Sequence, residues 1–193
     1  MGFPSAEEWL AERGLALASS QPATAPAKAV TGAVADAVRF IHRSTAKAPQ
    51  TTQRIRDKLI ARGVDAGCVE EAIAAAQASG ALDDAAFAKG LVDGWLARGH
   101  APRRIAHDLK NRGFSAGQVS AAIAAHTDKH DPYAAAFAVA MARANSLMAV
   151  APETALRRLS GHVQRRGYSP GVASKAARDA LYAAREKIQT AEA

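Results

Sequence analysis

One short pattern occurs three times in this chain, and it constrains the fold more than any other feature. Each copy has an Arg-Gly pair, then an apolar residue, then a residue that can cap a helix. The apolar and capping residues are Val64 and Asp65, Phe114 and Ser115, and Tyr168 and Ser169. Glycine ends a helix in a left-handed conformation, and the capping residue begins the next helix. The pattern therefore predicts three helical hairpins.

The similarity between the copies extends beyond the hairpin. Residues 55–73 (IRDKLIARGVDAGCVEEAI) align with residues 105–123 (IAHDLKNRGFSAGQVSAAI), and residues 111–118 (NRGFSAGQ) align with residues 165–172 (RRGYSPGV). A period of roughly 50 residues with three helices per unit is typical of a repeat protein. Alanine dominates the apolar residues and aromatics make up only 5%, which favours helices over strands. We predict an all-α fold, with three tandem three-helix repeats forming an elongated, curved, right-angle-packed helical array.

A change in composition indicates where the repeats begin. Ser5 and Glu8 form a capping box for a short first helix, and the SSQPATAPAK segment that follows has the composition of a flexible linker. We therefore expect an N-terminal extension, made of a short helix and a linker, over residues 1–32. The three repeats are expected over residues 33–80, 81–128 and 129–193, and the last should end in a long helix.

The predicted helices carry recognisable signals at their ends. Thr51, Asp65 and Asp83 are placed to cap helices, and Ser115 with Gln118 forms a capping box. Proline suits the first helical position and glycine the position after the last, as expected for Pro102 and Pro170 and for Gly99, Gly113 and Gly167. Asp84 would lie at the positive end of a helix dipole, and Phe87 begins the apolar face of the same helix.

The bulk properties favour a binding protein. The formal net charge of +7 suits an anionic partner such as nucleic acid or an acidic protein surface, although charge also serves solubility alone. The single cysteine, Cys68, allows no internal disulfide and no thiolate metal cluster. Glutamates occupy the region where a secretion signal has basic residues, and no window has the ~20 apolar residues of a membrane span. We expect a cytoplasmic protein that does not enter a membrane.

Two segments carry motifs of a known family. The matching residues of the central segment are Gly80, Leu82, Asp83, Asp84, Phe87, Ala88, Arg98, Gly99, Pro102, Arg103, Arg104, Ile105, Leu109 and Gly113. Residues 156–169 add LRRLSGHVQRRGYS. These motifs resemble the RecX family, regulators of the RecA recombinase, and the resemblance covers roughly residues 33–185. Departures from the family pattern are Ala81 for tyrosine, Ala101 for glycine, Val163 for leucine, Tyr168 for phenylalanine, and Arg54 at a first-repeat position that is often acidic.

The resemblance implies a non-enzymatic regulator without a cofactor. Members of the family bind RecA, in particular its nucleoprotein filament on single-stranded DNA, and lie along the groove of that filament. They dampen its ATPase, strand-exchange and co-protease activities in DNA repair and the SOS response. We accordingly expect a monomer that binds RecA and its filament, with weak direct binding to single- or double-stranded DNA.

The second helix of each repeat carries a basic strip beside its buried face. The candidate residues for binding RecA or DNA are Arg54, Lys58 and Arg62 in the first repeat, Arg103, Arg104, His107, Lys110 and Arg112 in the second, and Arg157, Arg158, Arg165 and Arg166 in the third. The planar fork of arginine binds phosphate and carboxylate alike. The alternative is a solvated face on which arginine stems cover alanine-rich surface.

Other functions compete with this interpretation. A protein that acts directly on DNA through its hairpins would bind naked DNA tightly and with a steep salt dependence. An enzyme is disfavoured, because the sequence has no phosphate-binding loop and no nucleophile with an evident base. The adjacent carboxylates of Asp83 and Asp84 are explained by a helix cap and a dipole partner.

Two further features have alternative explanations. His126 and His130 lie one helical turn apart with Asp128 and Asp131 nearby, which is a possible spacing for zinc ligands, although helix-end residues of these types are commonly solvated. Cys68 is expected to be an incidental thiol, because no activating base can be identified.

Overall fold

The structure is a computed structural model that describes residues 27–127 and 131–192 of the 193-residue chain. Within these residues every regular element is a helix, which confirms the all-α prediction. The elements are α2 (Ala27–Lys47), α3 (Thr52–Ile60), α4 (Ala66–Ala78), α5 (Asp84–Ala97), α6 (Pro102–Asn111), α7 (Ala116–Thr127), α8 (Pro132–Ala144), the short 3-10 helix η1 (Asn145–Leu147), α9 (Pro152–Arg165) and α10 (Pro170–Glu192).

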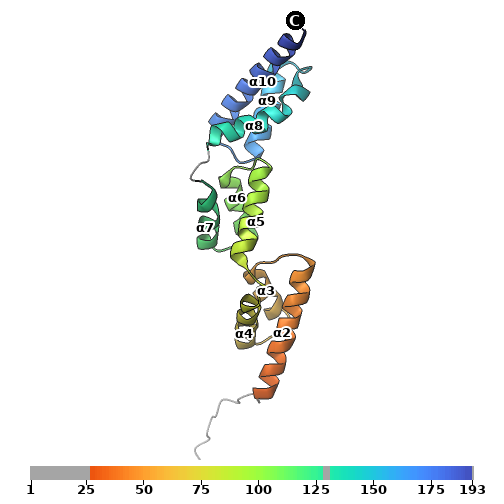
Figure 1. Cartoon of the computed structure of the whole chain (residues 1–193), viewed down its shortest axis with the longest axis vertical. Helices are drawn as coiled ribbons and strands as arrows, with labels where there is room; N and C mark the ends of the chain where they lie inside the picture. Colours follow the sequence, from red (N-terminus) through yellow and green to blue (C-terminus); the bar gives the residue numbers. More distant parts are fainter. Residues whose placement is uncertain (1–26, 128–130, 193) are drawn as a thin grey trace, which may run out of the picture.

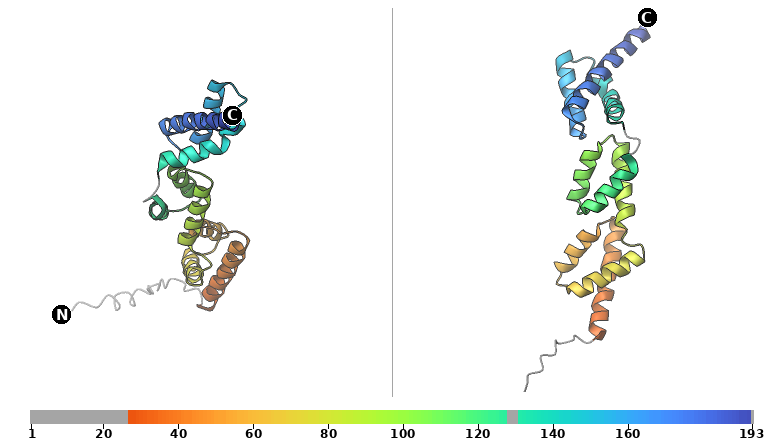
Figure 2. Two further views of the ribbon diagram at one scale, coloured as in Figure 1. Left: turned by 45° about the horizontal axis from the view of Figure 1, so that its top comes forward. Right: turned by 90° about the vertical axis from the view of Figure 1, so that its left-hand side faces the viewer.

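The helices form three successive groups along one long axis, α2–α4, α5–α7 and α8–α10 (Figure 1). Each group surrounds its own hydrophobic core, and the two further views in Figure 2 show the same succession. The largest fully buried side chains are Ile41, Ile55, Leu59 and Val69 in the first core, Val92, Ile105 and Leu109 in the second, and Leu159 and Val163 in the third. The chain is therefore an elongated array of three tandem repeats, as the sequence predicts.

The third core is built largely from alanine. Eight alanines of α8 and α10 are completely buried: Ala136, Ala140, Ala144, Ala173, Ala176, Ala177, Ala180 and Ala184. Small side chains let two helices pack closely, and α9 lies against both through Leu159 and Val163. Helix α9 is therefore held in place by close packing against α8 and α10, with its other face exposed.

The capping predictions agree with the hydrogen bonds. Asp83 accepts a bond of 2.8 Å from the backbone N–H of Ala86 at the start of α5. Ser115 and Gln118 form the reciprocal capping box, with bonds of 2.8 and 3.3 Å between each backbone N–H and the other side chain. These local bonds explain why the helices begin where the sequence pattern indicates.

The structure differs from the predictions where the described residues begin. Helix α2 begins at Ala27, inside the segment expected to be a linker, because the alanines and the lysine after Pro26 are strong helix formers. At the other end, α10 (Pro170–Glu192) is the long helix expected to end the third repeat. The capping box at Ser5 and Glu8, with the first predicted helix, lies outside the described residues.

Candidate functional site

The second helices of the three repeats, α3, α6 and α9, are joined end to end. The Thr51 hydroxyl, at the N-cap of α3, donates a 3.1 Å hydrogen bond to the carbonyl of Arg112, the C-cap of α6. The backbone N–H of Ala101, at the N-cap of α6, donates a 2.8 Å bond to the carbonyl of Arg166, the C-cap of α9. The two joints use equivalent positions. We call the resulting row α9–α6–α3 the helix column; its labels follow one another in this order from top to bottom along the long axis of Figure 1.

Glycine is required at both joints by the backbone, and at the joint between α6 and α9 also by the lack of space. Gly113 and Gly167 have φ angles of +91° and +99°, which end the helix as predicted. A Cβ atom on Gly167 would lie 2.5 Å from Cβ of Arg104, and one on Gly113 would lie 3.4 Å from the Thr51 hydroxyl. Gly167 therefore also lets the second and third repeats approach each other, which the hairpin pattern did not predict, whereas the Cβ position of Gly113 makes only an ordinary contact.

Asp84 links the first and second repeats at another point. Its carboxylate accepts bonds of 2.9 Å from the backbone N–H of Thr52 and of 3.0 Å from the side-chain amide of Gln118. Asp84 therefore fixes the start of α3 against α5 and α7. The sequence predicted a dipole partner within α5 and missed this role, because Thr52 and Gln118 are distant along the chain.

The candidate basic residues occupy the accessible side of the helix column. Arg166 is half-buried, whereas the others are exposed: Arg54, Lys58, Arg62, Arg103, Arg104, His107, Lys110, Arg112, Arg157, Arg158 and Arg165. Arg62 lies over the ring of Phe40 at 3.7 Å, and Arg112 lies 5.4 Å from the ring centroid of Trp95. These aromatic contacts orient two of the guanidinium groups near the ends of α3 and α6 without neutralising their charge.

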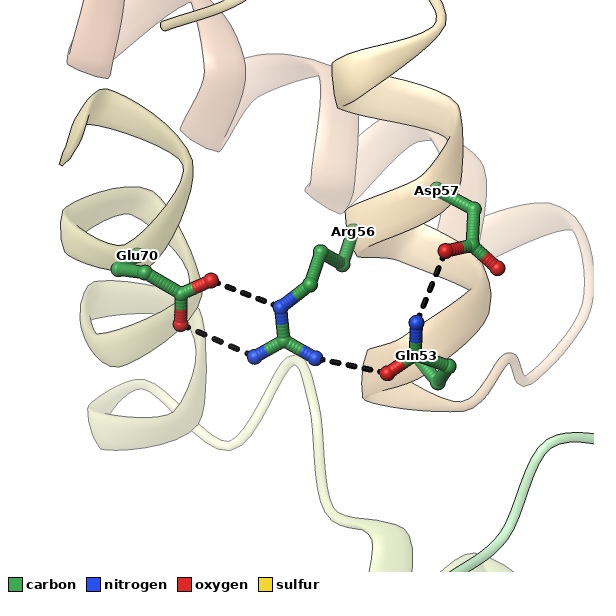
Figure 3. A network of polar contacts seen from close by, with 4 residues as sticks. All are labelled: Gln53, Arg56, Asp57 and Glu70. Atoms are coloured by element: carbon green, nitrogen blue, oxygen red, sulfur yellow. Dashed lines mark hydrogen bonds and ion pairs between the residues drawn. The ribbon is translucent and has the colours of Figure 1, made fainter. Parts of the chain in front are cut away.

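A neighbouring arginine on α3 shows what a neutralised position looks like (Figure 3). Arg56 makes bonds of 2.7 and 2.9 Å to both carboxylate oxygens of Glu70, and its third bond goes to Gln53. The hydrogen bond with Arg56 lowers the pKa of Glu70, and the same bond raises the pKa of Arg56. Arg56 therefore serves the packing of α3 on α4. Among the candidates in the described residues, only Arg104 has a carboxylate partner, Asp108 at 2.9 Å.

The joint between α6 and α9 brings basic and aromatic groups together. A shallow hollow of about 370 Å³ is lined by Arg103, Arg104, His107, Gln164, Gly167, Tyr168 and Pro170. Tyr168 is buried beneath it, and burial raises the pKa of its hydroxyl. The basic strip of α6 is thus continuous with the end of α9.

His100 precedes this joint and was not identified from the sequence. Burial lowers its pKa, and Arg166 and Arg104 lower it further. Arg166 also donates to the backbone carbonyl of Arg98, on the other side of Gly99. The turn between α5 and α6 is therefore held directly by the third repeat.

The possible zinc ligands and the single cysteine make packing contacts or lie outside the described residues. His126 of α7 pairs with Asp93 of α5 and contacts the carbonyl of Ala122, whereas His130 and Asp128 lie outside the described residues. Cys68 is buried at the start of α4. Within the described ranges, no group of three or more His, Cys, Asp or Glu residues is placed to hold a metal ion. None of the described helices is both long enough and apolar enough to cross a membrane.

A family model and several curated proteins that resemble this chain all belong to one family. Residues 83–123 match the family described as RecX, second three-helix domain. Regulatory protein RecX of Thermobifida fusca (strain YX) is 32% identical over 142 residues, covering 73% of this chain and 76% of that protein. Regulatory protein RecX of Streptomyces lividans is 29% identical over 134 residues, covering 69% of this chain and 71% of that protein.

Two solved structures share the fold. The crystal structure of RecX from Lactobacillus salivarius superimposes with a TM-score of 0.64 at 14% identity, covering 78% of this chain and 97% of that chain. A crystal structure of regulatory protein RecX gives a TM-score of 0.59 at 20% identity, covering 89% of this chain and 85% of that one. Because the Thermobifida protein is 32% identical across most of both sequences, this chain belongs to the RecX family of regulatory proteins.

Proposed function

We propose that this protein binds the RecA recombinase and its filament on single-stranded DNA, and that it inhibits ATP hydrolysis, strand exchange and co-protease activity. Membership of a family of regulatory proteins supports a role in regulation without catalysis. We take the candidate basic residues of α3, α6 and α9 as the contact surface.

The observation that carries this proposal is the helix column. The bonds from Thr51 to Arg112 and from Ala101 to Arg166 place three basic helices in one row. A filament presents acidic or phosphate groups at repeated positions, so a row of cations on an elongated molecule can engage several of them at once. Guanidinium groups with no carboxylate partner are available for such contacts.

Inhibition of the recombinase is the direct test. Purified protein is added to the cognate RecA on single-stranded DNA, and ATP hydrolysis is followed across a range of ratios. We expect inhibition at stoichiometric or lower amounts, and unchanged hydrolysis at those ratios would refute the proposal.

Binding to naked DNA separates this function from direct action on nucleic acid. We expect weak binding to DNA alone and much stronger binding to the filament. The opposite order, with tight and steeply salt-dependent binding to naked DNA, would favour a protein that acts on DNA directly.

A further inference from the structure

A second basic hollow lies within the third repeat, away from the joints. Its volume is about 300 Å³, and its lining residues are Arg143, Leu147, Arg157, Arg158, His162 and Arg165. Arg143 belongs to the last turn of α8, and the other basic residues belong to α9. We call this group the α8–α9 pocket. It contains four guanidinium groups and one imidazole, but no carboxylate lines it.

The charges of the α8–α9 pocket are not neutralised by neighbours. Among the described residues, five other arginines and lysines pair with aspartate or glutamate, namely Arg39, Arg56, Lys89, Arg104 and Lys175. By contrast, none of the four arginines of the pocket forms an ion pair with another described residue. Four like charges around one hollow repel one another, and the repulsion is relieved when an anion enters.

The pocket is carried by rigid elements. Arg158, His162 and Arg165 project from successive turns of α9, so they lie on one face of the helix. The guanidinium of Arg165 comes within 3.4 Å of the Cβ position of Gly161, so its side chain runs back along the helix. The fully buried Leu159 and Val163 hold another face of α9 in the core. Packing therefore fixes the helix that carries these donors, while the arginine side chains themselves are exposed.

The pKa of His162 responds to the positive charges around the pocket. It is half-buried, and burial is the main cause that lowers its pKa below the usual value. Arg143, Arg166 and Arg165 lower the pKa further through their positive charge. An anion bound among these arginines would oppose that effect and raise the pKa of His162 again.

We propose that the α8–α9 pocket binds a phosphate group through Arg143, Arg158, His162 and Arg165. A phosphate offers oxygens in several directions and can carry more than one negative charge, whereas a carboxylate has two coplanar oxygens and a single charge. Guanidinium groups that approach from two helices suit a phosphate better than a carboxylate. The phosphate belongs either to a nucleic-acid backbone or to a free phosphate compound, and both sources share this chemistry.

The pocket deepens the proposed function and rests on it for its biological role, because Arg157, Arg158 and Arg165 are also candidates for contact with the filament. Phosphate binding can nevertheless be measured without the recombinase. Failure of this inference and failure of the proposed function are therefore distinguishable.

The test uses the full chain and two double variants of equal charge change. Arg143→Ala with Arg158→Ala removes one pocket arginine from each helix. Arg178→Ala with Arg185→Ala removes two exposed arginines of α10 that line none of the described hollows near α9. Binding of a labelled oligo-dT is followed by fluorescence anisotropy, and inorganic pyrophosphate is titrated separately. Circular dichroism verifies that each variant is folded.

We expect the pocket variant to lose about tenfold in affinity for at least one of the two ligands, and the α10 variant to change by about twofold or less. Loss with oligo-dT alone identifies a nucleic-acid phosphate, and loss with pyrophosphate alone identifies a free phosphate compound. Equal losses in both variants, or no binding of either ligand to the wild-type protein, would overturn the inference. Loss of RecA inhibition in the pocket variant without phosphate binding by the wild type would instead indicate an acidic protein partner, and it would also overturn the inference.

A variant with retained charge and an NMR titration make the test independent of folding defects. Arg143→Lys with Arg158→Lys keeps both charges but removes the planar forks, so we expect an intermediate loss of affinity. The pKa of His162 is followed by NMR, with His162→Gln used to assign the signal. Saturating pyrophosphate or oligo-dT should raise this pKa, and an unchanged value with both ligands would contradict the pocket.

Discussion

Gly167 combines two constraints at one position. Its φ of +99° disfavours any residue with a side chain, and its Cβ position is already occupied by Arg104 of the preceding repeat. Gly63 has a φ of +78° but open space around it, and Gly171 has open space and no positive φ. Substitution of these three glycines therefore distinguishes the free energy lost to backbone strain from that lost to a steric clash at the joint.

Alanine substitution at these glycines should give a graded loss of stability. We expect Gly171→Ala to change the free energy of unfolding by less than about 0.5 kcal/mol, and Gly63→Ala to lower it by about 1 kcal/mol through strain alone. Gly167→Ala should cost about 2–4 kcal/mol, because strain and overpacking add. Urea unfolding followed by circular dichroism measures all three. Equal costs for Gly63→Ala and Gly167→Ala would show that the joint does not constrain the chain.

Two histidines should make the fold sensitive to acid. Burial and nearby arginines lower the pKa values of His100 and His162 in the folded protein. Their neutral forms therefore favour the folded state, and this contribution is complete above the unfolded pKa of about 6.5. It is lost as the pH falls from there through the lowered folded values.

The double variant His100→Gln with His162→Gln should thus lose less thermal stability than the wild type between about pH 7.5 and pH 5. Thermal unfolding at each pH measures the difference. His42→Gln, at an exposed position of α2, serves as the control. If the double variant loses as much stability on acidification as the wild type, the two histidines do not carry the effect.

The helices in this protein begin at residues whose side chains cap them locally. At the first joint between repeats, the capping residue also bonds to the neighbouring repeat. Thr51 accepts from the backbone N–H of Arg54 at 3.2 Å and donates to the carbonyl of Arg112 at 3.1 Å. Asp65 at the next helix start accepts only a local bond in the described residues, from the backbone N–H of Gly67 at 2.8 Å. One cap therefore connects two repeats, and the other does not.

Removing the Thr51 hydroxyl should disturb both sides of the first joint. We expect Thr51→Val to lower stability by about 1–2 kcal/mol and to speed hydrogen exchange at the start of α3 and at the end of α6. Asp65→Ala should cost about 1 kcal/mol and affect only the start of α4. Thr51→Ser keeps the hydroxyl and serves as the second control. Unchanged exchange at the end of α6 in Thr51→Val would contradict the role of this bond in the joint.

Local signals explain how much of the fold could be predicted from sequence. The cap at Asp83, the capping box of Ser115 and Gln118, and the glycine after α6 act within a few residues, so the pattern alone identifies them. The bonds of Asp84 to Thr52 and Gln118 connect residues whose proximity depends on how repeats pack. The α8–α9 pocket was likewise missed in part, because Arg143 precedes α9 by a turn and a short helix and shares no repeat position with the basic strips.

The described part of the chain is elongated, and basic residues follow its long axis on the helix column. Three small cores in succession leave a large surface, and the helix column lines up the basic strips of α3, α6 and α9 across the repeats. Among the candidate residues of the column that the structure describes, only Arg104 has a carboxylate partner, so several arginines there are unpaired. Such an arrangement suits a long anionic partner better than a small ligand.

The central claim is that the helix column makes the inhibitory contact with RecA, and charge reversal in the ATPase assay tests it most directly. Arg103→Glu with Arg104→Glu and Arg157→Glu with Arg158→Glu reverse the column at two repeats, whereas Arg178→Glu with Arg185→Glu gives α10 the same change of charge. We predict that each column variant needs at least about tenfold more protein for half-maximal inhibition, and that the α10 variant stays within about twofold of the wild type. Inhibition that is unchanged in both column variants, or weakened equally in all three, would contradict the claim.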